Sequence, residues 1–176
     1  TCRPALGKRR DVGRRKGRLD DNRDRAKTAR PIPMRILIWT HAFPPSIGGI
    51  ETFCDRLAVG LIRRGHRVEI LTNGAGGGPP KTTLHRGVSV HNFPFRHAME
   101  TNNLAAMRIQ HEACSETIDR FDPDIIQMNL VSVGLFNFLL QQKRKRRPTL
   151  LTIHEHILFS DNSSVAAAAL AAVDGI

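Results

Sequence analysis

The chain has 176 residues and a net charge of +11, enough for one domain with a sizeable core and too few for two ordinary α/β domains. Residues 1–33 hold 12 Lys and Arg against 4 Asp, whereas the rest holds 15 basic against 12 acidic side chains. The longest apolar stretch, Val165 to Val173, is about half the length of a membrane span, which excludes a bilayer-crossing helix.

The basic segment 1–33 has almost no apolar periodicity, so we expect a disordered tail there and one domain over 34–176. Basic runs bind polyanions without specificity, which would make the tail a nucleic-acid or membrane arm. The favoured alternative is that the segment is upstream sequence read through or a poorly chosen start, because Met34 stands directly before the first predicted strand. The three cysteines are odd in number and widely spaced, which indicates free thiols and a cytoplasmic location.

The first predicted element is a strand over 35–39, followed by a loop over 40–49 with two prolines and two glycines. Short apolar runs are typical of strands buried on both faces of a parallel sheet. An amphipathic helix follows, because apolar residues recur at a spacing of three and four: Ile50, Phe53, Cys54, Leu57, Ala58, Leu61 and Ile62. Gly65 ends this helix before a second buried strand around 68–71, which completes a βαβ unit.

The same alternation continues along the chain. After a glycine-rich loop we predict an edge-like strand at 88–90, a helix over 98–119, a strand over 125–129, a helix over 131–142, a strand over 149–153 and a final alanine-rich helix. Strands and helices that alternate with short loops indicate an α/β fold: a Rossmann-like parallel sheet with helices on both faces.

The Gly48-Gly49 pair stands where a helix begins. Helix starts present unpaired N–H groups and a partial positive charge, and glycine lets a phosphate approach the backbone. The alternative is a tight turn that needs glycine for its geometry alone, and spacing does not separate the two. Glu51 has two equal interpretations, a ligand contact or a first-turn carboxylate that offsets the helix dipole. The spacing matches neither the dinucleotide fingerprint nor a Walker loop.

His154 comes just after the fifth predicted strand, at the sheet edge where α/β proteins bind ligands. An imidazole there can donate to developing charge or orient a hydroxyl, although a structural hydrogen bond to backbone is the alternative. Glu155 and His156 could share the role, and His41 in the first loop is a second candidate. We expect no metal, because no further spaced ligands accompany the two histidines.

Three motifs together carry a family resemblance: Gly-Gly-Ile-Glu before the first helix, Pro-Asp-Ile-Ile at 123–126, and Pro-Thr-Leu-Leu-Thr-Ile-His at 148–154. Over residues 34–176 the chain resembles the N-terminal half of a family 4, retaining glycosyltransferase with the GT-B fold. The resemblance implies an acceptor-binding domain whose donor-binding partner domain is absent from these residues, so we expect the chain alone to be inactive. It implies a nucleotide-diphosphate sugar as donor substrate, no cofactor, and a carbohydrate or lipid-linked acceptor.

The resemblance also assigns roles to residues. It implies that Gly48 and Gly49 face the donor phosphates and that His154, in Thr-Ile-His, lies near the reacting sugar as the catalytic residue. Where family members often have histidines at the end of the fourth strand, this chain has Gln-Met-Asn at 127–129. The amide of Asn129 can still bind sugar hydroxyls.

Two other functions compete with this one. A sugar-nucleotide epimerase of the same fold is one, and a non-catalytic protein that binds nucleic acid through the tail and the basic run 143–147 is the other. Aromatic residues make up only 5% of the chain, and it carries no nucleic-acid-binding signature. Both observations count against nucleic-acid binding, so we expect no specific nucleic acid partner. The basic run could instead dock peripherally on the cytoplasmic membrane face, although a solvated helix end is favoured.

Overall fold

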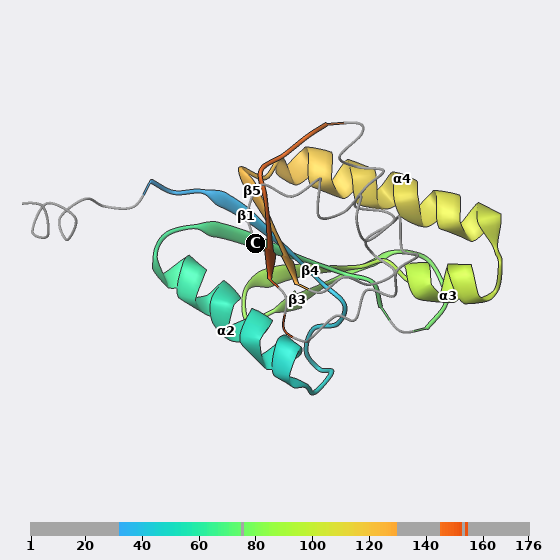
Figure 1. The fold of residues 1–176 in the computed structure, drawn as a ribbon, viewed down its shortest axis with the longest axis horizontal. Coiled ribbons are helices and arrows are strands. Elements are labelled where there is room, and N and C mark those ends of the chain that lie inside the picture. Colours follow the sequence, from blue (N-terminus) through green and yellow to red (C-terminus); the bar gives the residue numbers. More distant parts are fainter. Residues whose placement is uncertain (1–31, 75, 130–144, 153, 155–176) are drawn as a thin grey trace, which may run out of the picture. The chain divides into compact units, whose positions relative to one another are not determined.

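The structure is a computed structural model that describes residues 32–74, 76–129, 145–152 and 154 (Figure 1). These residues belong to a compact unit that begins at Ile32. The elements in chain order are β1 (Arg35–Thr40), α2 (Gly49–Arg63), β2 (Arg67–Thr72), β3 (Lys81–His85), β4 (Val88–Asn92), α3 (Phe95–Glu100), α4 (Leu104–Phe121), β5 (Ile125–Asn129) and β6 (Thr149–Thr152). The tail up to residue 31, the helix predicted over 131–142 and the alanine-rich helix lie outside the described residues.

The six strands form one sheet in the order β3-β4-β2-β1-β5-β6. Every neighbouring pair is parallel except β3 and β4, which form an antiparallel hairpin. The predicted Rossmann-like α/β class is therefore confirmed. The chain leaves β1 towards β2 on one side and later places β5 on the other, so the topological switch point lies between β1 and β5.

Helices cover both faces of the sheet, with α2 on one face and α3 and α4 on the other (Figure 1). Alternate residues of each strand point to opposite faces, so β1 feeds both cores. Ile36 and Ile38 pack with Cys54 and Ala58 of α2, while Leu37 and Trp39 belong to the core that α4 completes. Burial on both faces explains why these strands are continuous apolar runs in the sequence.

Helix α2 begins and ends where its sequence predicts. Gly48 is its N-cap, and the Gly48 carbonyl accepts hydrogen bonds from the backbone N–H and the hydroxyl of Thr52, at 3.1 and 2.8 Å. At the other end Gly65 has a φ of +89°, in the left-handed region that glycine adopts at little cost, and its N–H donates to the Ile62 carbonyl.

Two predictions about the middle of the chain are wrong in detail. The strand at 88–90 is not at the edge: β4 lies inside the sheet, and the edge is β3, which we did not predict. Strand β3 has the sequence KTTLH, and its first four residues are exposed, so it lacks a buried-strand signature. The single helix predicted over 98–119 is in fact two helices, α3 and α4. The chain turns between them at Asn102, which has a φ of +50°. Helix α4 then begins with Asn103 as its N-cap, whose side chain accepts a hydrogen bond from the Ala106 N–H.

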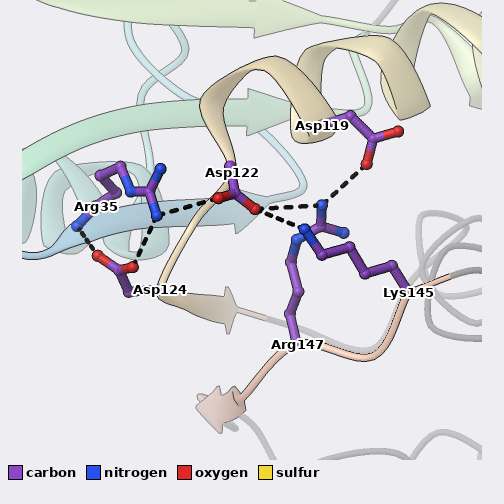
Figure 2. A network of polar contacts seen from close by, with 6 residues as sticks. All are labelled: Arg35, Asp119, Asp122, Asp124, Lys145 and Arg147. Carbon is purple, nitrogen blue, oxygen red and sulfur yellow. Dashed lines mark hydrogen bonds and ion pairs between the residues drawn. The ribbon is translucent and has the colours of Figure 1, made fainter.

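A network of charged side chains ties the amino ends of three strands together (Figure 2). Asp124, just before β5, accepts hydrogen bonds from the backbone N–H and the guanidinium of Arg35 at 2.7 and 3.0 Å. The Arg35 guanidinium also lies 3.2 Å from the carboxylate of Asp122. These contacts fix the register between β1 and β5.

The second half of the network gives Arg147, the last residue of the basic run, a structural role. The Arg147 side chain is only 4% exposed and lies 2.9 Å from the Asp119 carboxylate of α4, while Lys145 lies 2.8 Å from Asp122 (Figure 2). A buried guanidinium of this kind is stable only when paired. Arg147 therefore joins the start of β6 to α4 and is available neither to solvent nor to a membrane.

The network predicts an acid-sensitive stability. Hydrogen bonds from Lys145 to Asp122, and from Arg35 to Asp124, lower the pKa of each carboxyl group below its ordinary value of 3.8. A lowered pKa in the folded state stabilises the protein above 3.8, and this contribution is lost as the pH falls through the folded value. In urea titrations, Asp124→Asn should therefore lower the free energy of unfolding near neutral pH and weaken its dependence on pH below 3.8.

The control for this measurement is Glu100→Gln. Glu100 pairs with Arg96 one helical turn away, and both side chains are more than half exposed. Exposed pairs of this kind contribute little, so the control should follow the wild type at every pH. A flat wild-type profile down to pH 3, or an Asp124→Asn profile parallel to that of the wild type, would contradict the stabilising role of the network.

No helix in the described part of the chain is both long enough and apolar enough to cross a bilayer.

Candidate functional site

A row of polar residues lies across the carboxyl edge of the sheet. The strand register aligns the last residues of neighbouring parallel strands in this order: Asn92, Thr72, Thr40, Asn129 and Thr152. By strand alternation all of them face α2. Thr40 and Asn129 are each only 1% exposed. Since buried polar groups are costly without partners, such a row suggests a site rather than a core.

The centre of this row coincides with the topological switch point. Thr40 ends β1, Asn129 ends β5, and the two are directly paired in the register. Ligands of open α/β sheets bind in the crevice outside the carboxyl ends of the strands at such a point. The loop that leads from β1 to α2 leaves the sheet here, which brings Gly48 and Gly49 to the same edge.

Three side chains from three elements meet beside the switch point. Nε2 of His154, which follows β6, lies 3.0 Å from Oδ1 of Asn129 at the end of β5. The rings of His154 and Phe53 pack edge to face, with their centroids 4.9 Å apart and their planes at 67°. Phe53 belongs to α2, so His154 is held between the sheet and the helix. The structure thus brings together two predicted site residues, His154 and Asn129.

Sequence reasoning missed Phe53. The three-four spacing of α2 assigned it to the buried face, yet its side chain is 40% exposed, whereas its neighbour Cys54 is fully buried. Its position one helical turn after Gly49 was the signal that could have found it, because residues four apart lie on one side of a helix.

The backbone of Gly48 and Gly49 bears on why glycine stands there. Gly48 is extended, with φ −176° and ψ 175°, and neither glycine has a positive φ. A Cβ built on Gly49 would meet nothing within 4 Å. Neither position therefore requires glycine for a positive φ. At Gly48 an added Cβ would meet the Glu51 carboxylate, whereas Gly49 is open.

Glu51 lies against the same turn. Its carboxylate occupies the place that a Cβ on Gly48 would take, so the side chain folds back over the N-cap residue. A carboxylate in the first turn is favourable near the helix start. Glu51 would have to move for an anion to reach the N–H group of Gly48.

The loop before α2 is anchored at its base and open at its tip. Phe43 is buried in the core beneath α2, and its ring packs edge to face on His85, with the centroids 5.4 Å apart. His85 in turn bonds Asp55 of α2 at 3.1 Å. At the tip, Ile47 is fully exposed. The anchor fixes the start of α2 relative to the sheet while leaving the glycine pair accessible.

The remaining candidates have different outcomes. His41 follows β1, and its Nδ1 atom is buried without a hydrogen-bond partner among the described residues. Gln127 lies on the same face of β5 as Asn129, and its amide already donates a hydrogen bond to the Thr152 hydroxyl at 2.5 Å. Burial raises the pKa of the nearby Cys54 thiol above its ordinary value of 9.0, which keeps it protonated. Glu155 and His156 lie outside the described residues.

Comparison with known proteins places the chain in a family. The family model described as glycosyl transferase 4-like domain matches residues 48–175. A GDP-mannose-dependent alpha-mannosyltransferase of Mycolicibacterium smegmatis is 28% identical over 96 residues, which are 54% of this chain and 25% of that protein. The chain thus matches about a quarter of the length of this relative.

A solved structure, described as trehalose-6-phosphate from E. coli bound with UDP-2-fluoro glucose, aligns with 80% of this chain and 38% of its own, at 12% identity and a TM-score of 0.49. The family match covers well over half of the chain, including α2, β5, β6 and His154. The chain belongs to the family of glycosyl transferase 4-like domains.

Proposed function

We propose that this chain is the acceptor-side domain of a retaining glycosyltransferase, which moves a sugar from a nucleotide-diphosphate sugar to an acceptor hydroxyl. The observation that carries the proposal is the meeting of His154, Asn129 and Phe53 at the switch point, beside a helix start with open space at Gly49. Family membership supplies the class of reaction. Neither competing function, epimerase or nucleic-acid binder, gains support from this match.

The proposed roles follow the chemistry of each group. The unpaired N–H groups at the start of α2 attract the donor diphosphate, and Gly49 lets it approach the backbone. His154 lies beside the reacting sugar and interacts with charge or hydroxyl groups there. The acceptor is a carbohydrate or a lipid-linked sugar. Because the relative uses GDP-mannose, that compound is the first donor to test.

A donor-binding domain is proposed to lie in the remainder of the enzyme. This chain should therefore bind GDP-mannose weakly or not at all when titrated alone by calorimetry, whereas the protein that combines it with a donor-binding domain should bind in the micromolar range. Transfer of labelled mannose by the combined protein is the positive test. Micromolar binding by the isolated chain would contradict its assignment to the acceptor side. Consumption of the donor without transfer of its sugar to any acceptor would contradict the reaction class.

A further inference from the structure

The contact between Asn129 and His154 has a direction. The ring atom Nε2 lies 3.0 Å from the amide oxygen Oδ1, and an amide oxygen only accepts hydrogen bonds. The hydrogen must therefore come from the ring, so Nε2 carries it. In a neutral imidazole the other nitrogen, Nδ1, then bears the free lone pair.

We propose that Asn129 is a positioning residue that fixes His154 as the Nε2–H tautomer, which leaves Nδ1 to accept a hydrogen bond from a substrate hydroxyl. Asn129 suits this task because it is 1% exposed and stands in a strand paired on both sides, so its amide is held in place. The Phe53 ring packs against the imidazole from α2 and restricts its rotation. The inference rests on the proposed function and deepens it by naming the group that His154 meets.

The amide leaves a second group free at this site. Nδ2 of Asn129 is buried and has no hydrogen-bond partner among the described residues. An unpaired buried donor is costly, so such a group calls for an acceptor. The pair thus offers one donor, Nδ2, and one acceptor, Nδ1 of His154. Hydroxyl groups of a sugar both donate and accept, and they match this pair, whereas a phosphate, which only accepts, matches the donor alone.

Nitrogen NMR on the full chain with labelled histidine tests the tautomer directly, without any turnover. The spectra are recorded at about pH 8.5, above the ordinary titration range of histidine, where the protonated and unprotonated nitrogens of a neutral imidazole give well-separated signals. The His154 signals are identified by their loss in His154→Gln. The wild type should show hydrogen on Nε2. Asn129→Asp keeps an oxygen acceptor and should keep this tautomer, while Asn129→Leu should shift His154 towards a mixture.

The matched control is Asn92→Leu, which removes an amide from the same edge of the sheet three strands from Asn129. Asn92 accepts a hydrogen bond from Thr72 and has no bond to His154 among the described residues, so the His154 signals should not change. Hydrogen on Nδ1 in the wild type would overturn the proposal, even if a variant failed to fold. Unchanged signals in folded Asn129→Leu would overturn it too. A fixed tautomer in an enzyme without transferase activity would instead refute the proposed function alone.

Discussion

Replacing His154 with alanine should lower kcat on the order of 10²-fold or more, in the protein that combines this chain with a donor-binding domain, while donor affinity stays nearly unchanged. The imidazole lies at the carboxyl edge of the sheet, held by Asn129 and Phe53. A group that acts on charge or hydroxyls in the transition state affects the rate rather than ground-state binding. Initial rates and calorimetric titration with the donor measure the two quantities separately.

The control for this variant is His66→Ala. His66 lies before β2 at the opposite edge of the sheet, where its Nδ1 accepts a hydrogen bond from the Met34 N–H. Its loss should affect stability slightly and kcat not at all. If folded His154→Ala kept full turnover, His154 would be a structural residue, and the chemistry would have to be assigned to His41, Glu155 or His156.

Substituting Gly49 with valine should weaken donor binding by about 10-fold or more, equivalent to about 1.4 kcal/mol, without unfolding the domain. The added Cβ would meet nothing within 4 Å beyond its neighbours in the chain and helix, and the backbone has no positive φ to strain. Its methyl groups would instead stand where the diphosphate must approach the N–H groups of α2. The two variants therefore differ in kind, since His154→Ala affects rate and Gly49→Val affects affinity.

Gly60→Val is the matched control, because Gly60 lies in the middle of the same helix and its added Cβ would make only an ordinary contact at 3.5 Å with Arg64. Thermal midpoints should be similar for the two glycine variants, and only Gly49→Val should lose donor affinity. Equal donor affinity for both would show that no phosphate approaches the start of α2.

The α/β class followed from the sequence because strands buried on both faces are short continuous apolar runs, as in β1, β2 and β5. Strand β3 escaped detection because it is polar and mostly exposed at the sheet edge. The burial of Arg147 could not be foreseen, since it depends on Asp119 of α4, 28 positions earlier in the chain. An ion pair between residues far apart in the chain cannot be predicted from the local pattern of apolar and charged residues.

The sequence predicted those site residues whose position follows from the sheet topology, and it missed the one whose position depends on side-chain packing. His154 and Asn129 were expected at the carboxyl edge because each follows or ends a predicted strand, and the structure joins them by a hydrogen bond. Phe53 was missed because periodicity cannot tell the centre of a helical apolar face from its margin. The extended backbone of Gly48 and the position of the Glu51 carboxylate against it are also invisible in a sequence.

The most direct measurement is a crystal structure of the combined protein with a bound nucleotide-diphosphate sugar. Our account predicts donor phosphate oxygens within about 3 Å of the backbone N–H groups at Gly49, and a sugar hydroxyl at a similar distance from Nδ1 of His154. A donor whose phosphates and sugar lie away from the switch point between β1 and β5, with His154 in contact only with protein, would contradict it.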